Sequence, residues 1–115
     1  MFQVKYGSTR TVILTKNYAF KLPYIGRWKN FLLGLLSNMQ EVQFNTLKDE
    51  RLAKVVFYLP AGFLVVMRRA EALQKFDKKY FAGFCARKKG LVLPCELKKD
   101  SFGYIDGKLV AIDYG

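Results

Sequence analysis

The first part of the chain alternates between short apolar runs and polar breaks. "FQVKY" (residues 2–6) and "TVILT" (11–15) have strand-like composition, and "GSTR" between them is rich in turn-forming residues. "AFKLP" (19–23) follows after a second polar break, "KNY". Proline removes a backbone donor, so Pro23 marks the end of the third run. This pattern predicts a three-stranded meander.

Residues 24–41, "YIGRWKNFLLGLLSNMQE", change to helical spacing. Large apolar side chains recur every three or four residues, as expected for one face of a helix. We expect this face to be directed at the core, and its members are Trp28, Phe31, Leu32, Leu35 and Met39.

Two further apolar runs, residues 52–60 and 62–69, are rich in β-branched and aromatic residues. They meet at "PAG", where proline presets one turn dihedral and glycine supplies another. The pattern therefore predicts an antiparallel hairpin.

From Ala70 the spacing becomes helical again, which predicts a second helix that stops near Gly90. Its apolar positions are Leu73, Phe76, Tyr80 and Phe84. We expect Tyr80 and Phe84, like Trp28 and Phe31, to be core residues. Residues 91–94, 102–105 and 109–112 read as short strands, and the "DG" between the last two is a strong hairpin signal.

Taken together, these elements predict an α+β fold with an antiparallel sheet, in a single domain spanning residues 1–115. Half of the residues are apolar, so we expect a packed core. No apolar run reaches the roughly 20 residues that span a bilayer, and the start of the chain does not resemble a secretory signal. We therefore expect a cytoplasmic protein in which Cys85 and Cys95 are reduced.

Charge and composition limit the function. The chain has no histidine, which excludes the usual zinc sites and a histidine base. Its net charge of +11 attracts polyanions, so an acidic protein or another polyanion is an expected partner. Nucleic acid is an alternative partner, through Arg87, Lys88, Lys89 and exposed aromatic side chains. Solvation alone also explains each charge cluster.

The order of elements resembles the protein-kinase-like superfamily, in particular the aminoglycoside-phosphotransferase branch and its phage-borne relatives. Residues 1–69 resemble the smaller, nucleotide-binding lobe, and residues 70–115 resemble a reduced larger lobe made of a helix and short hairpins. The resemblance implies a phage-type origin, and hence the host cytoplasm as location.

Within this resemblance, "YAFKLP" is similar to the strand whose lysine faces nucleotide phosphates, which implies that role for Lys21. The following helix would supply the glutamate that pairs with this lysine. Glu41 is the candidate, with Asp49 and Glu50 as alternatives. "GFLVVMRRAEAL" resembles the hinge strand, and its main chain at Met67, Arg68 and Arg69 would hold the adenine edge of ATP.

The end of the chain, "ELKKDSFGYIDGKLVAIDYG", carries the most specific part of the resemblance. "IDYG" is similar to the metal-binding D-x-G motif, which implies that Asp113 binds magnesium. The preceding loop departs from the family pattern at three positions. Glu96 replaces the catalytic aspartate, Lys98 replaces a histidine, and Ser101 replaces a metal-binding asparagine.

These departures favour a kinase-like pseudoenzyme or interaction module that binds a host or viral macromolecule. The alternative is a minimal phosphotransferase in which Lys21 holds the ATP phosphates, Asp113 and Ser101 hold magnesium, and Glu96 is the catalytic group. A small basic nucleic-acid-binding protein is a second alternative. Taken singly, Lys21, Glu41 and Asp113 also fit ordinary surface positions. The family reading predicts that Lys21 and Asp113 face one cleft, between the first sheet and the last hairpin.

Overall fold

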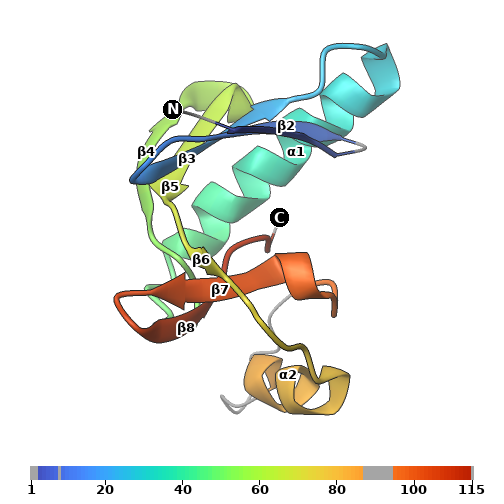
Figure 1. Ribbon diagram of the computed structural model, residues 1–115. Coiled ribbons are helices and arrows are strands. Elements are labelled where there is room, and N and C mark those ends of the chain that lie inside the picture. The colour runs from blue at the N-terminus through green and yellow to red at the C-terminus, as the bar shows by residue number, and fades with distance from the viewer. Residues whose placement is uncertain (1–2, 8, 87–94, 115) are drawn as a thin grey trace.

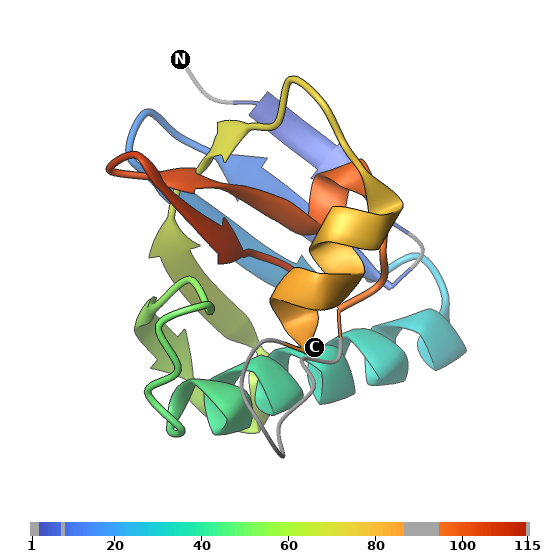
Figure 2. The same cartoon turned by 90° about the horizontal axis from the view of Figure 1, so that it is seen from below.

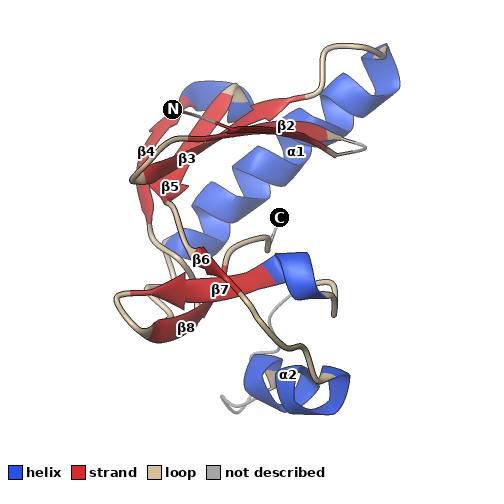
Figure 3. Ribbon diagram, viewed as in Figure 1, coloured by secondary structure: helices blue, strands red, loops and turns tan. Residues whose placement is uncertain are grey.

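A computed structural model describes residues 3–7, 9–86 and 95–114, and shows two antiparallel sheets and two α-helices (Figures 1 and 3). The first sheet has five strands in the order β1 (Gln3–Tyr6), β2 (Arg10–Leu14), β3 (Tyr18–Pro23), β5 (Leu64–Arg68) and β4 (Val55–Leu59). The second has three, in the order β6 (Glu71–Ala72), β7 (Phe102–Ile105) and β8 (Lys108–Ala111). The predicted α+β class with an antiparallel sheet is confirmed.

The predicted meander and both hairpins are present. β1, β2 and β3 pair in sequence, and β4 pairs with β5 through a short 3₁₀ turn at Pro60–Gly62. Asp106 and Gly107 both have positive φ, of 52° and 77°, which gives a tight connection matching strand twist between β7 and β8. The predicted strand 91–94 and the helix stop at Gly90 lie outside the described residues.

Helix α1 (Trp28–Asn45) lies on one side of the five-stranded sheet, and the second sheet lies on that side too (Figures 1 and 2). The predicted core-facing stripe is wrong for three of its five members: Trp28, Leu32 and Met39 are 73%, 45% and 42% exposed. Phe31 and Leu35 are half-buried. The buried residues of α1 are Gly34, Asn38 and Glu41.

Polar residues occupy the inward face of α1 because the sheet surface that they meet carries buried cations. Asn38 Nδ2 donates to the carbonyl oxygens of Lys21, at 3.0 Å, and Gly62, at 2.9 Å. The backbones also come very close. A Cβ on Gly34 would lie 2.2 Å from the carbonyl oxygen of Thr9, so only glycine fits without a shift.

Helix α2 (Lys78–Cys85) is much shorter than predicted. It begins after Asp77, whose side chain accepts hydrogen bonds from the main-chain N–H groups of Lys79 and Tyr80. The preceding residues form β6 and a loop instead of a helix, because β6 pairs with β7. Tyr80 is 54% exposed, which corrects its expected place in the core, whereas Phe84 is buried.

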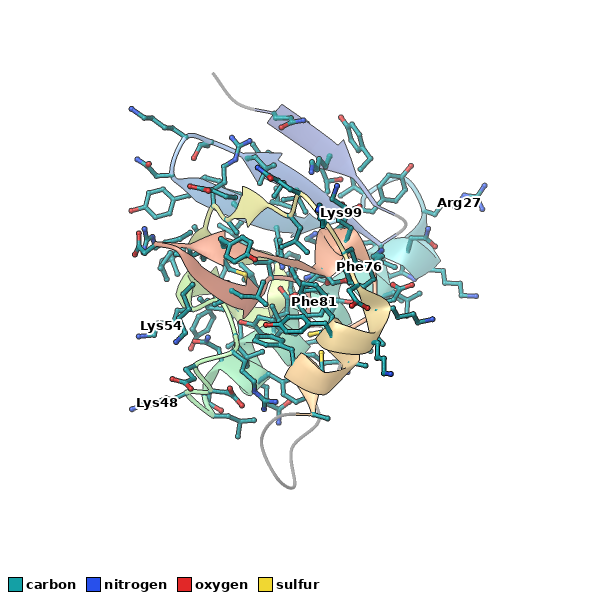
Figure 4. The ribbon with its side chains drawn as sticks, turned by 60° about the horizontal axis from the view of Figure 1, so that its bottom comes forward. Arg27, Lys48, Lys54, Phe76, Phe81 and Lys99 are labelled. Atoms are coloured by element: carbon teal, nitrogen blue, oxygen red, sulfur yellow. The ribbon has the colours of Figure 1, made fainter. Side chains whose placement is uncertain are left out.

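Aromatic side chains build the core between the second sheet and α2. Phe76 and Phe81 stack with centroids 4.9 Å apart, and Phe81 packs on Phe102 at 4.7 Å (Figure 4). Cys85 is buried and Cys95 half-buried, and both are free thiols. Within the residues that the structure describes, neither helix has the length and apolarity needed to cross a membrane.

Candidate functional site

Lys21 and Glu41 form a buried ion pair between β3 and α1. Lys21 Nζ lies 3.0 Å from both carboxylate oxygens of Glu41, and it also donates to the carbonyl oxygen of Ile112. The side chains are 7% and 0% exposed. The two alternative acids pair elsewhere, Asp49 with Arg51 and Glu50 with Lys108.

Arg10 joins the site in the structure, although it was not among the site residues predicted from the sequence. One guanidinium nitrogen, Nη1, lies 2.8 Å from Glu41 Oε1 and donates to Asn38 Oδ1 at 3.1 Å. The other, Nη2, donates to Asp113 Oδ1 at 2.5 Å. Alternation along β2 was the available signal, because Val12 pairs with Lys21 and Arg10 shares the face of Val12.

The last described residues close this arrangement. The main-chain N–H of Tyr114 donates to Glu41 Oε2 at 3.1 Å, and the Tyr114 hydroxyl donates to the carbonyl oxygen of Ala53 at 2.7 Å. Tyr114 itself is fully buried. Glu41 therefore accepts from three different parts of the chain. We refer to Arg10, Lys21, Glu41 and Asp113 as the inner charge cluster.

The pKa shifts follow from how the charges are shared. Burial opposes ionisation of Glu41, but the charges of Lys21 and Arg10 together outweigh it and lower the pKa of this carboxyl. Burial lowers the pKa of Lys21, and the charge of Arg10 lowers it further, against the attraction of Glu41 that raises it. Burial also disfavours charge on Arg10, yet Glu41 and Asp113 raise its pKa.

A cleft of about 510 Å³ opens between the five-stranded sheet and the second sheet. Both Lys21 and Asp113 line it, as the sequence analysis predicted. Met67 and Arg68 line it too, but Arg69 does not. Arg69, the third residue predicted to form the hinge, donates its main-chain N–H to the carbonyl oxygen of Asn17 and its guanidinium to the carbonyl oxygen of Thr15.

The loop residues that the resemblance made catalytic or metal-binding are not members of the inner charge cluster, although the carbonyl oxygen of Ser101 accepts from the main-chain N–H of Ile112, next to Asp113, at 2.9 Å. The Glu96 side chain is 77% exposed at the edge of the cleft and lies 3.5 Å from the ammonium of Lys98. Ser101 is buried, and its hydroxyl has no hydrogen-bond partner among the described residues. Ser101 is not among the residues that line the cleft, whereas Asp113 is.

This donor set does not fit a magnesium ion as it is arranged. Magnesium needs oxygen ligands converging in octahedral geometry. Here the Asp113 carboxylate is bonded to Arg10, and Ser101 does not share the cleft with it. In the described part of the chain, no group of three or more cysteine, aspartate or glutamate side chains is placed to hold a metal.

The alternative nucleic-acid residues, Arg87, Lys88 and Lys89, lie outside the described residues. Lys5, Lys98 and Lys99 also line the cleft, and acidic side chains such as Glu71 and Asp100 lie among them. The cleft therefore presents mixed charge.

The inner charge cluster can hold the five-stranded sheet and the residues after the second sheet together through buried charge.

No protein-family model matches the chain, and its sequence matches no curated protein.

Proposed function

We propose that this protein is a kinase-like pseudoenzyme, of phage-type origin and at work in the host cytoplasm, that serves as an interaction module for an acidic macromolecule. The observation that carries the proposal is that the inner charge cluster is closed on itself. Its cations and carboxylates contact each other, and Asp113, whose side chain is 40% exposed, also borders the cleft.

Lys21 illustrates this closure. An ammonium group has three protons to donate, and the acceptors around Lys21 Nζ are the two oxygens of Glu41 and the carbonyl of Ile112. A nucleotide phosphate at this nitrogen would have to displace one of them. One oxygen of the Asp113 carboxylate is bonded to Arg10, although this side chain is 40% exposed. A lysine paired with the helix glutamate is also what an active kinase needs, so it is the Arg10–Asp113 contact, at the residue expected to bind magnesium, that favours a structural role over a catalytic one.

That structural role is to join the two sheets. Glu41 on α1 contacts Lys21 of the first sheet and Tyr114, which follows the second sheet. A buried charge that loses its partner is costly by about 3–5 kcal/mol, so the cluster holds the C-terminal segment firmly against α1. A protein can keep the fold of a family in this way without keeping the family's catalytic activity.

The net charge of +11 supports an acidic partner because long-range attraction raises the encounter rate with a polyanion. The test is affinity capture from a host lysate at low and moderate salt, followed by binding measurements with each purified candidate. We expect at least one specific partner whose affinity falls as salt rises. Recovery of no specific partner at either salt concentration would contradict the proposal.

A minimal phosphotransferase is the second candidate, supported by the size of the cleft. A volume of about 510 Å³ falls in the range typical of small-molecule sites, and Lys21 and Asp113 share its wall. Incubation with labelled ATP and a panel of proteins and small molecules tests this candidate. Transfer of label above the rate of an Asp113→Asn variant would favour it over the pseudoenzyme.

A further inference from the structure

We propose that the outer face of the five-stranded sheet, turned away from α1, docks an acidic protein through an apolar stripe. This inference rests on the proposed function and names the surface that the function uses. The outer face comprises the side chains that the strand register places opposite those of the inner charge cluster, and its members are Val4, Thr11, Ile13, Tyr18, Phe20, Leu22, Leu64, Val66, Arg68, Phe57 and Leu59.

The strand register defines this face directly. One row of paired residues crosses all five strands, and every member is apolar: Val4, Ile13, Phe20, Val66 and Phe57. The adjacent row on the other face contains Lys5 and Lys21, both of which line the cleft. A separate shallow groove on the outer face is lined by Tyr18, Phe20, Val56, Phe57 and Val66.

The charged residue that the register places on this face is Arg68, opposite Tyr18, and its guanidinium bonds the Asp106 carboxylate. The face is open to solvent along its edges, where Tyr18 is 43% exposed and Phe57 54% exposed. Both α1 and the second sheet lie on the opposite side of the five-stranded sheet (Figures 1 and 2). Five strands about 4.8 Å apart, each with about five residues rising 3.3 Å, give a face of roughly 400 Å². Val66 at its centre is packed, at 6% exposed, and the largest apolar patch on a monomer is of about this size and is often functional.

The charge around the face indicates what kind of partner it takes. Residues 3–7 and 9–40, and the strands β4 and β5, contain no aspartate or glutamate. Lys16, Lys54 and Arg69 lie at one end of the sheet, at the β2–β3 turn, before β4 and after β5. Within the described residues, none of these three cations is paired with a carboxylate. Lys54 points away from the body of the protein (Figure 4).

These features favour an acidic protein over the other possible occupants. A second copy would bring a further +11 against the same cations. A single-stranded nucleic acid needs cations along its path as well as aromatic rings, and here the cations gather at one end while much of the face is aliphatic. A standard interface buries about 800 Å² per partner, so the partner must extend past the face onto the cationic end.

The test uses three synthetic peptides that share an alternating valine and threonine stripe and end in a run of glutamates, serines or lysines. Fluorescence anisotropy measures each dissociation constant. We expect the glutamate peptide to bind at least about tenfold more tightly than the lysine peptide. Phe57→Ser and Lys16→Glu should each weaken it by about tenfold or more, because central apolar contacts and paired charges dominate such interfaces.

Matched variants on α1 serve as controls. Leu32→Ser removes an apolar side chain that is 45% exposed, and Lys29→Glu reverses an exposed charge, both away from the outer face. Neither should change the affinity for the glutamate peptide by more than about twofold. Circular dichroism of all four variants verifies that each is folded.

Several results would overturn the inference. Equal binding of all three peptides, or none, would remove the surface from consideration. Binding of an oligothymidine that Phe57→Ser abolishes would assign the face to nucleic acid, and self-association abolished by Phe57→Ser in sedimentation experiments would assign it to a second copy. If a captured partner is lost with Leu32→Ser but kept with Phe57→Ser, the proposed function stands and this inference fails.

Discussion

The two faces of the five-stranded sheet distribute charged and apolar side chains in the opposite way from most antiparallel sheets that have one face in water. An antiparallel sheet with one exposed face usually directs polar side chains to water and apolar ones to the core. Here the charged members Lys5, Arg10 and Lys21 all face the cleft, whereas the central row of the outer face, Val4, Ile13, Phe20, Val66 and Phe57, is entirely apolar. The difference teaches that each face needs a partner. The cations of the inner face pair with Glu41 and Asp113, and we propose that the outer face binds another molecule.

The largest change in the free energy of unfolding should come from removing the Glu41 carboxylate, which accepts from the cations of the inner face. Glu41→Ala leaves two buried cations without their shared carboxylate, and we expect it to lower the free energy of unfolding by about 3–5 kcal/mol. Urea denaturation followed by circular dichroism measures the change. Glu50→Ala is the matched control, since its side chain is 84% exposed and only 3.6 Å from Lys108, and it should cost less than about 0.5 kcal/mol. Equal costs would show that the inner cluster is not structural.

Acid should reproduce part of this loss in the unmodified protein. Because the folded state lowers the pKa of Glu41, ionised Glu41 contributes stability above its unfolded pKa of about 4.3. That contribution is lost as the pH falls through the lower, folded pKa. Thermal unfolding measured from pH 6 to pH 2 should therefore show a steeper decline for the unmodified protein than for Glu41→Gln. Parallel curves would contradict the assignment.

A smaller change in the free energy of unfolding should come from the close contact between α1 and the backbone at Thr9. Gly34→Ala forces a Cβ to within 2.2 Å of the Thr9 carbonyl oxygen, so we expect a loss of about 1–3 kcal/mol. Gly83→Ala lies in α2 with nothing within 4 Å of the added Cβ, and alanine favours helix by about 0.5–1 kcal/mol. Chemical denaturation should show opposite signs. The same sign for both would mean that α1 does not pack this closely.

The smallest effect on stability should come from the outer face. Phe57 is 54% exposed on the edge strand β4, so Phe57→Ser should lower the free energy of unfolding by no more than about 1 kcal/mol. The same denaturation assay compares it with Glu41→Ala. A loss as large as that of Glu41→Ala would mean that the outer face supports the fold, and the comparison between faces would fail.

Strand positions and hairpins could be predicted because they depend on local signals. "PAG" and "DG" fix their turns through backbone conformations that few other residues adopt, and both hairpins form where expected. Apolar runs of four to six residues bounded by such turns leave little freedom in register.

The orientation of α1 could not be predicted in the same way. Its apolar positions repeat at helical spacing, which normally indicates the buried face. The buried face is instead set by Asn38 and Glu41, because Arg10 and Lys21 of the sheet require acceptors. That requirement becomes visible only when strands and helix are placed together. The length of α2 was overestimated for a related reason, since β6 takes its residues to pair with β7.

The Lys21–Glu41 pair of the candidate site could be predicted from the sequence. The contacts of Arg10, which close the inner charge cluster, could not. Lys21 and Glu41 meet as the family resemblance implied, and Asp113 lines the same cleft as Lys21. Alternation along β2 places Arg10 on the same face as Lys21, but it does not indicate that Arg10 bonds both Glu41 and Asp113. One arginine at the start of β2 thus changes the interpretation of the whole cluster.

The central claim is that the inner charge cluster is closed and structural, and a thermal-shift titration tests it most directly. The protein and its Asp113→Asn variant are each titrated with ATP, with and without magnesium. A ligand at about 100 times its dissociation constant would stabilise the native state by about 2.7 kcal/mol, a shift of several degrees for a domain of this size. The account predicts no magnesium-dependent shift in either protein. A magnesium-dependent shift that Asp113→Asn abolishes would contradict it and establish a working nucleotide and metal site.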